Sequence, residues 1–141
     1  RVEVRLELSE PLPSVNCDAS QIQQVVLNLL LNAAEATRGA GLIVVRTRPV
    51  YQGNQVLLEV QDNGAGIPPE IQKHIFDPFF TTKEEGKGVG LGLAVVYGII
   101  ESHDGEIEVD SQVGQGTTFR VILPMATPTD TNAVPEGTAH A

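Results

Sequence analysis

Residues 21–37, QIQQVVLNLLLNAAEAT, carry the pattern that most constrains the fold of this chain. Apolar residues recur there with helical spacing, so the segment predicts a long amphipathic helix that buries one face. Asp18 precedes it as the predicted N-cap, and Gln21 completes a capping-box pattern three residues later. Asn28 and Asn32 lie four residues apart on one face of the same helix. Such a helix requires a second layer to cover its apolar side.

Alternating and apolar segments elsewhere supply that second layer. Strands are predicted at 2–8, 42–48, 55–61, 105–112 and 116–124, and further helices at 69–76 and 91–103. Strand 2–8 is expected to be half-buried, because its apolar residues alternate with charged ones. The predicted fold class is an α/β two-layer sandwich, in which a mixed, mainly antiparallel sheet of about five strands carries three helices on one face.

The composition changes near residue 124 and indicates where the domain ends. Residues 1–124 are predicted to form one domain with its own core. Residues 125–141, MATPTDTNAVPEGTAHA, contain too little apolar material to fold and are interpreted as a flexible tail or linker.

The net charge of −9 disfavours nucleic acid as a partner, because a phosphate backbone requires clustered Lys and Arg. A bound polyphosphate would need local backbone donors, a few lysines and a metal ion. No apolar run reaches the length of a membrane span, and the single cysteine, Cys17, fits a reducing compartment. We therefore expect a cytoplasmic domain without direct membrane contact, which leaves anchoring of a longer parent protein open.

Glycines at 86, 88, 90 and 92 stand directly ahead of an apolar helix pattern. They fit neither a P-loop, which needs Gly-Lys-Ser/Thr, nor a dinucleotide fingerprint, whose third glycine position is occupied by Leu93. A flexible linker would explain the glycines alone. The alternative is that the loop and the helix start expose backbone amides to an anion.

Two further groups allow a structural and a functional interpretation. Asn28 and Asn32 sit among apolar helix positions, where an amide needs a partner. Both could bind loop backbone, or one could ligate a hard cation such as Mg²⁺ through its carbonyl oxygen. The segment DNGAG at 62–66 is typical of a turn. Alternatively, Asp62 accepts a hydrogen bond from the exocyclic amine of adenine, where guanine presents an acceptor.

These segments, in this order, resemble the ATP-binding catalytic domain of sensor histidine kinases. That domain belongs to a superfamily shared with gyrase, the ninety-kilodalton heat-shock chaperones and the mismatch-repair ATPases, and its architecture is the Bergerat fold. QVVLNLLLNAAEA resembles the N box, DNGAGI the first glycine box, IFDPFFTTK the F box, GKGVGLGLAVV the second glycine box, and GQGTTF the final Gly-Thr element. The likeness spans nearly all of residues 1–124.

The resemblance implies ATP and Mg²⁺ as the bound groups and assigns roles to individual positions. Asn32 would ligate the metal, and Asn28, Asn32 and Lys83 would serve catalysis. Asp62 and Thr117 would surround the adenine, and residues 77–90 would form a lid over the phosphates. The residues placed around the nucleotide are Asn28, Asn32, Asp62, Gly64, Gly66, Ile67, Phe76, Phe80, Thr81, Thr82, Lys83, Lys87, Gly88, Val89, Gly90, Leu91, Gly92, Leu93 and Thr117.

One position bears on the chemistry. ATP-hydrolysing relatives carry a glutamate base four residues before the metal asparagine, whereas this chain has Asn28 there, whose amide cannot take a proton. Transfer of the γ-phosphate is therefore favoured over hydrolysis. None of His74, His103 and His140 is a credible phospho-acceptor, so the acceptor is expected on a separate dimerisation and histidine phosphotransfer domain.

The implied partners are that domain and the receiver domain of a response regulator, and the isolated domain is expected to be monomeric. Two alternatives stay open: a serine protein kinase of the anti-sigma type, and a non-catalytic, ATP-regulated binding module.

Overall fold

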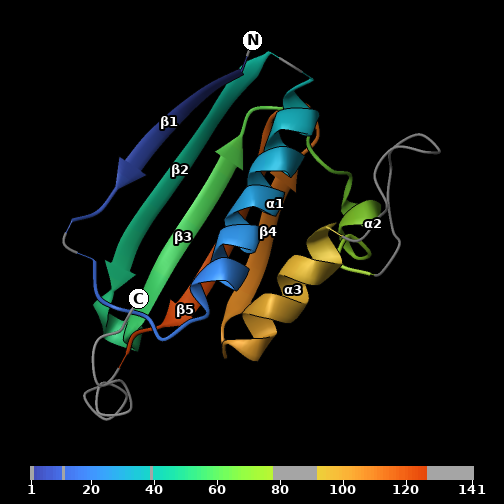
Figure 1. Cartoon of the computed structure of the whole chain (residues 1–141). Helices are drawn as coiled ribbons and strands as arrows, with labels where there is room; N and C mark the ends of the chain where they lie inside the picture. The colour runs from blue at the N-terminus through green and yellow to red at the C-terminus, as the bar shows by residue number, and fades with distance from the viewer. Residues whose placement is uncertain (1, 11, 39, 78–91, 127–141) are drawn as a thin grey trace.

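A five-stranded mixed sheet forms one layer of the molecule (Figure 1). The structure is a computed structural model that describes residues 2–10, 12–38, 40–77 and 92–126. The strands are β1 (Val2–Leu8), β2 (Gly41–Val50), β3 (Gln55–Asp62), β4 (Glu106–Gln112) and β5 (Gly116–Pro124). Their order is β1-β2-β3-β5-β4; β1 runs parallel to β2, and every other neighbouring pair is antiparallel. The predicted fold class is confirmed.

Three helices cover one face of the sheet (Figure 1). They are α1 (Ala19–Thr37), α2 (Pro69–Gln72) and α3 (Gly92–Ser102), and a 3₁₀ turn (Tyr51–Gly53) links β2 to β3. Helix α1 packs on β2, β3, β5 and α3, while α3 also packs on β4. Val25 and Leu29 of α1, Val60 of β3 and Val121 of β5 are almost completely buried in the core between the layers.

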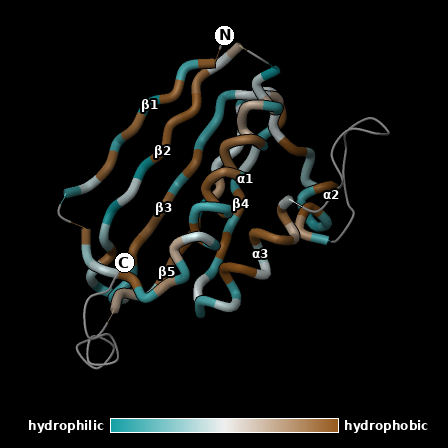
Figure 2. Tube along the Cα trace, in the orientation of Figure 1, coloured by the Kyte–Doolittle hydropathy of each residue, from teal (hydrophilic) through white to brown (hydrophobic). Residues whose placement is uncertain are grey.

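Strand β1 is more exposed than its sequence pattern predicts. Figure 2 shows β1 alternating between hydrophobic and hydrophilic residues, as expected. However, Val4, Leu6 and Leu8 are 53%, 62% and 53% exposed. The reason is tertiary: β1 is an edge strand, and α1 packs on β2, β3 and β5 rather than on β1.

The helix ends also differ in detail from the predictions. The Asp18 carboxylate caps α1 by accepting the backbone N–H groups of Ser20 and Gln21 at 3.0 and 3.2 Å. The reciprocal half of the capping box is replaced, because the Asp18 N–H donates to Nε2 of His103. The residue with left-handed backbone after α1 is Arg38, at φ 56°. Helix α2 begins at Pro69 as predicted but ends at Gln72, four residues before the predicted end.

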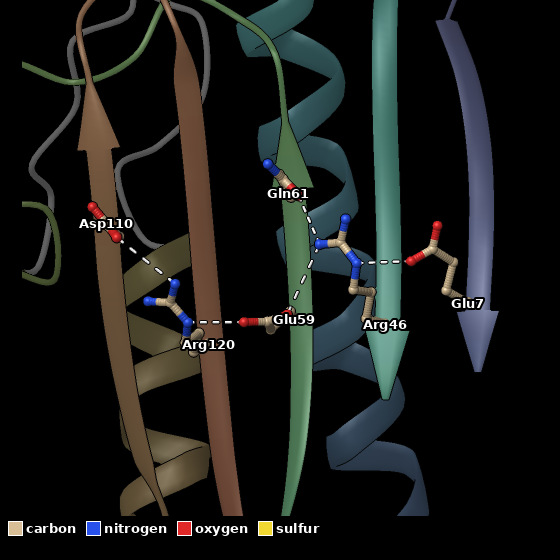
Figure 3. A network of polar contacts seen from close by, with 6 residues as sticks. All are labelled: Glu7, Arg46, Glu59, Gln61, Asp110 and Arg120. Carbon is tan, nitrogen blue, oxygen red and sulfur yellow. Dashed lines mark hydrogen bonds and ion pairs between the residues drawn. The ribbon is translucent and has the colours of Figure 1, made fainter. Parts of the chain in front are cut away.

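Polar and charged side chains, including Asp110 of β4 beside Arg120, link all five strands across the other face of the sheet (Figure 3). Arg46 on β2 lies 2.8 Å from Glu7 on β1 and donates to Gln61 on β3 at 2.7 Å. Arg120 on β5 donates to Glu59 on β3 at 2.8 Å. Since all these groups are polar, this face does not require a second layer of helices.

The last described residues continue past β5. Met125 N–H donates to Asn54 O and Ala126 N–H to Ser14 O, at 2.7 and 2.8 Å. The rest of the predicted tail lies outside the described residues, so the domain boundary at 124 stays a prediction. Within the described part, no helix is both long and apolar enough to pass through a bilayer.

Candidate nucleotide-binding site

Asp62 and Thr117 lie side by side at one end of the sheet. Asp62 is the last residue of β3, and Thr117 is its partner in the antiparallel register with β5. Asp62 lies two residues after Val60 and Thr117 two residues before Phe119, both of which are core residues, so both side chains point to the helix-covered face. They are 6% and 4% exposed, respectively. The structure thus brings together two of the residues predicted to surround a base.

Burial raises the pKa of the Asp62 carboxyl above its ordinary value of 3.8, because desolvation penalises the charged form. Hydrogen bonds from the backbone N–H groups of Gly64 and Thr117 act in the opposite direction. The bond from Gly64 to Oδ1 is 2.8 Å long. A buried carboxylate held by two backbone donors is a preorganised hydrogen-bond acceptor, as recognition of an exocyclic amine requires.

The loop after Asp62 is attached to four separate elements. Asn63 Oδ1 accepts the N–H of Leu42 on β2 at 2.9 Å, and Ala65 N–H donates to a carbonyl at the end of α1 at 3.2 Å. Ile67 N–H donates to Ser111 Oγ on β4 at 2.8 Å. Gln72 of α2 donates to the carbonyl of Ile67, also at 2.8 Å. These bonds hold the loop in place before any ligand is present.

The glycines of this loop are required by packing against the protein. A Cβ on Gly64 would lie 2.4 Å from the carbonyl oxygen of Ala36, and one on Gly66 would lie 2.1 Å from that of Gln112. Gly66 also has a φ of 80°. Close approach of the loop to α1 and to the end of β4 therefore accounts for both glycines. Their predicted contact with a base stays a prediction.

The two asparagines of α1 have different surroundings. Asn28 Nδ2 donates to the carbonyl of Gly92, the first residue of α3, at 3.4 Å. Asn32, one turn later, is half-buried, and its side chain forms no hydrogen bond with another described residue. Its amide oxygen is therefore available to a hard cation, which suits magnesium. Because no group of three or more His, Cys, Asp or Glu side chains that could hold a metal occurs among the described residues, other ligands would have to come from phosphate and water.

Phe76 and Leu93 stand near the ends of the described ranges on either side of residues 78–91, and both pack on the core. The Phe76 ring lies 5.5 Å from that of Tyr97 and 6.3 Å from that of Phe119, between centroids. Leu93 is partly buried against the core cluster. The predicted site residues between them lie outside the described residues: Phe80, Thr81, Thr82, Lys83, Lys87, Gly88, Val89, Gly90 and Leu91.

Two shallow hollows occur near the edge strand β4. One, of about 270 Å³, lies between α3 and β4 and includes none of the predicted site residues. Its lining consists of Tyr97, Ile100, Glu101, Gly105, Glu106, Ile107 and Glu108. The other, of about 260 Å³, is lined by Asp62 and Thr117 together with polar residues of β4 and β5. Neither hollow includes Asn28 or Asn32.

Residues 17–127 match the model of the histidine kinase-, DNA gyrase B- and HSP90-like ATPase family. The chain belongs to this family. It is 43% identical over 136 residues to the sensor kinase CckA of Brucella abortus, covering 87% of this chain and 14% of CckA. It is 45% identical over 125 residues to the signal transduction histidine-protein kinase AtoS of Escherichia coli, covering 89% of this chain and 20% of AtoS. The chain thus spans a fifth or less of the length of these relatives.

Solved structures of the ATPase family share the fold. Full-length ShkA in complex with AMPPNP superposes with a TM-score of 0.79 at 32% identity, covering 89% of this chain and 26% of ShkA. The catalytic domain of the histidine kinase ThkA gives 0.76 at 35% identity, covering 88% of this chain and 79% of that domain. ThkA in complex with the response regulator protein TrrA gives a TM-score of 0.73 at 32% identity, covering 89% of this chain and 34% of the ThkA chain. The chain has the fold of a histidine kinase catalytic domain.

Two residues that the family motifs do not contain also contribute to the site. Ser111 joins β4 to the loop at Ile67 and to Thr117, and Gln72 joins α2 to the same loop. A sequence signal for Ser111 did exist. It continues the series Ile107 and Val109 on the helix-facing side of β4, where a polar residue requires a buried partner.

Proposed function

We propose that this chain is the ATP-binding catalytic domain of a sensor histidine kinase. It holds Mg·ATP and presents the γ-phosphate to a histidine on a separate dimerisation and phospho-acceptor domain. The phosphoryl group then passes to the receiver domain of a response regulator, and the reaction takes place in the cytoplasm. The relatives CckA and AtoS, which bear the names of such kinases, support this proposal.

The observation that carries the proposal is the buried carboxylate of Asp62. It accepts backbone N–H groups from Gly64 and Thr117, which fix its position, and it retains unused lone pairs. A carboxylate in this position can accept a hydrogen bond from the 6-amino group of adenine. The same carboxylate would repel the 6-oxo group of guanine, so it selects the base.

The helix α1 supplies the groups next to the phosphates. Asn32 has an amide oxygen that is not used by the described part of the chain and would ligate Mg²⁺, which neutralises phosphate charge when bound. Asn28 donates to Gly92 O and cannot act as a base toward water. A net charge of −9 makes such neutralisation necessary, and Lys83 and Lys87 are predicted to assist.

Nucleotide binding is tested first. Calorimetric titration with ADP and Mg²⁺ should show binding to the chain and at least about a tenfold weaker affinity for Asp62→Asn, since the amide can present its N–H₂ to the base instead of an acceptor. Asp104→Asn, which changes an exposed carboxylate between α3 and β4, is the matched control and should bind normally. Equal affinity of Asp62→Asn and the unchanged chain would exclude Asp62 as the base-reading group.

Phosphoryl transfer is tested next. The chain is mixed with ATP labelled at the γ-phosphate and with purified phospho-acceptor hairpins from relatives such as AtoS. Label that is lost in acid indicates phosphohistidine and supports the proposal. Acid-stable label would indicate a serine kinase, and ATP binding without label on any hairpin would indicate a binding module.

A further inference from the structure

The hydroxyl of Ser111 has three hydrogen-bonding neighbours. Its Oγ accepts the N–H of Ile67 at 2.8 Å, lies 3.0 Å from the carbonyl oxygen of Gly116, and lies 2.7 Å from the Thr117 hydroxyl. Ser111 therefore connects the loop after Asp62 with the start of β5.

The valence of the hydroxyl decides the direction of each bond. A serine hydroxyl has one proton to donate and two lone pairs to accept with. The carbonyl of Gly116 can only accept, so the proton of Ser111 goes to Gly116. The N–H of Ile67 fills one lone pair. The Thr117 hydroxyl must then donate its own proton to the second lone pair across the 2.7 Å contact.

The opposite arrangement is unfavourable. If Ser111 donated to Thr117, the lone pairs of Ser111 Oγ would face the carbonyl oxygen of Gly116 at 3.0 Å without a proton between them. Gly116 is buried, so water would not readily relieve this repulsion. The hydroxyl of Thr117 thus has its proton committed to Ser111 and retains only lone pairs for other partners.

This polarity matters because Thr117 lies beside Asp62. The Asp62 carboxylate is an acceptor, and a Thr117 hydroxyl with its proton committed is a second acceptor next to it. Two adjacent hydrogen-bond acceptors favour binding of a purine that carries an amino group at position 6 and disfavour binding of one that carries an oxo group there.

We infer that Ser111 is a positioning residue for base recognition, which directs the Thr117 hydroxyl proton away from the nucleotide and so strengthens selection of 6-amino over 6-oxo purines. The inference rests on the proposed function for the site, and it adds a residue that touches no nucleotide atom itself. Its consequence is measurable as a ratio of two affinities rather than as an affinity alone.

Gln72 provides a matched control within the same loop. Its Nε2 donates to Ile67 O at 2.8 Å and lies 3.3 Å from Ser111 O, so it holds the same loop without contacting the Thr117 hydroxyl. Gln72→Ala should loosen the loop and weaken the binding of all nucleotides to the same extent. Ser111→Ala should loosen the loop as well, but it also frees the proton of Thr117, which can then donate to a 6-oxo group.

The experiment compares ADP with IDP, whose bases differ at position 6 and in the N1 proton. Calorimetric Kd values are measured for the unchanged chain, Ser111→Ala, Ser111→Thr and Gln72→Ala. The ratio of the IDP Kd to the ADP Kd should fall about tenfold in Ser111→Ala, as expected for one mispaired buried hydrogen bond. It should be retained in Ser111→Thr, which restores the hydroxyl, and in Gln72→Ala. A Ser111→Ala protein that binds ADP with an unchanged ratio would overturn the inference.

A second measurement does not depend on any variant or on nucleotide binding. In the nucleotide-free chain, NMR contacts of the Thr117 hydroxyl proton should place it toward the Cβ protons of Ser111. A Thr117 hydroxyl proton directed elsewhere would overturn the inference even if Ser111→Ala failed to fold. Conversely, correct proton placement in a chain that binds neither ADP nor IDP would refute the proposed function and leave the hydroxyl arrangement intact.

Discussion

The imidazole of His103 caps the first turn of α1 from the far end of α3. Its Nε2 accepts the backbone N–H of Asp18 at 3.0 Å, and its Nδ1 lies 2.8 Å from the carbonyl oxygen of Ile99. The ring must therefore be the neutral Nδ1–H tautomer, which donates to Ile99 and accepts from Asp18. This contact ties the helix that carries the asparagines to the helix that follows the predicted lid.

Removal of the His103 ring should destabilise the fold. His103→Ala leaves the Asp18 N–H without its acceptor and removes one contact between α1 and α3, so the free energy of unfolding should fall by about 1 kcal/mol in urea denaturation. His74→Ala is the comparison, because His74 pairs with Asp77 on an exposed surface. Its effect should stay below about 0.5 kcal/mol. Equal stability of His103→Ala and the unchanged chain would show that the contact contributes nothing.

The raised pKa of Asp62 predicts opposite effects of pH on stability and on binding. A carboxyl whose pKa is raised in the folded state contributes stability below its unfolded value of 3.8, and loses it as pH rises through the folded pKa. At neutral pH the charged Asp62 therefore costs stability, and Asp62→Asn should unfold at a higher temperature than the unchanged chain. At a pH below both pKa values this advantage should disappear.

The affinity for ADP should change with pH in the direction opposite to stability. The 6-amino group needs the ionised carboxylate, so ADP affinity should weaken as pH falls through the raised pKa of Asp62. Asp62→Asn removes this titration while the phosphates of ADP still titrate. The prediction is therefore a difference between the two pH profiles of Kd. Parallel profiles would contradict it.

Two glycines of the β4–β5 turn should differ sharply in their tolerance of alanine. A Cβ on Gly116, at φ 126°, would meet the carbonyl oxygen of Asp62 at 2.0 Å, whereas a Cβ on Gly114, at φ 83°, would have nothing within 4 Å. Gly114→Ala should cost about 1–2 kcal/mol of backbone strain. Gly116→Ala should cost more than about 3 kcal/mol and should also weaken ADP binding, because it displaces Asp62. Chemical denaturation of both variants tests this, and equal losses would refute it.

The ion pairs on the open face should contribute unequally (Figure 3). The Glu59 side chain is only 14% exposed and contacts both Arg46 and Arg120, at 3.9 and 2.8 Å. Glu59→Gln should lower the free energy of unfolding by about 1 kcal/mol. Glu7→Gln, at the exposed edge strand, should change it by less than about 0.5 kcal/mol. High salt should reduce the difference, and a larger effect of Glu7→Gln would contradict the structure.

Much of this fold was predictable because its signals are short-range. The apolar period of 21–37, the alternation of 2–8 and the turn residues between strands each depend on neighbours within a few positions, and the structure confirms the resulting elements. The local pattern DNGAG left Asp62 open between a turn and a base-reading role, and the resemblance to the kinase family assigned the second. The Asp18 cap followed from the same kind of local rule, and its carboxylate bonds are present.

The remaining features depend on residues that are distant along the chain. His103 takes the place of Gln21 as the acceptor of the Asp18 N–H, because α3 brings it next to Asp18 although the two residues are 85 positions apart. Capping rules consider only neighbours in sequence and could not predict this contact. The position of α1 leaves β1 exposed despite its amphipathic pattern. A glycine is required at position 66 because the carbonyl of Gln112 lies too close for a side chain. Ser111 and Gly116 determine the direction in which the Thr117 hydroxyl donates its proton. Local sequence patterns determine the helices, the strands and the candidate site residues. Packing between these elements determines how exposed each residue is, which groups it hydrogen-bonds and in which direction it donates. These properties depend on groups that are distant in sequence and are brought into the same buried, low-dielectric space.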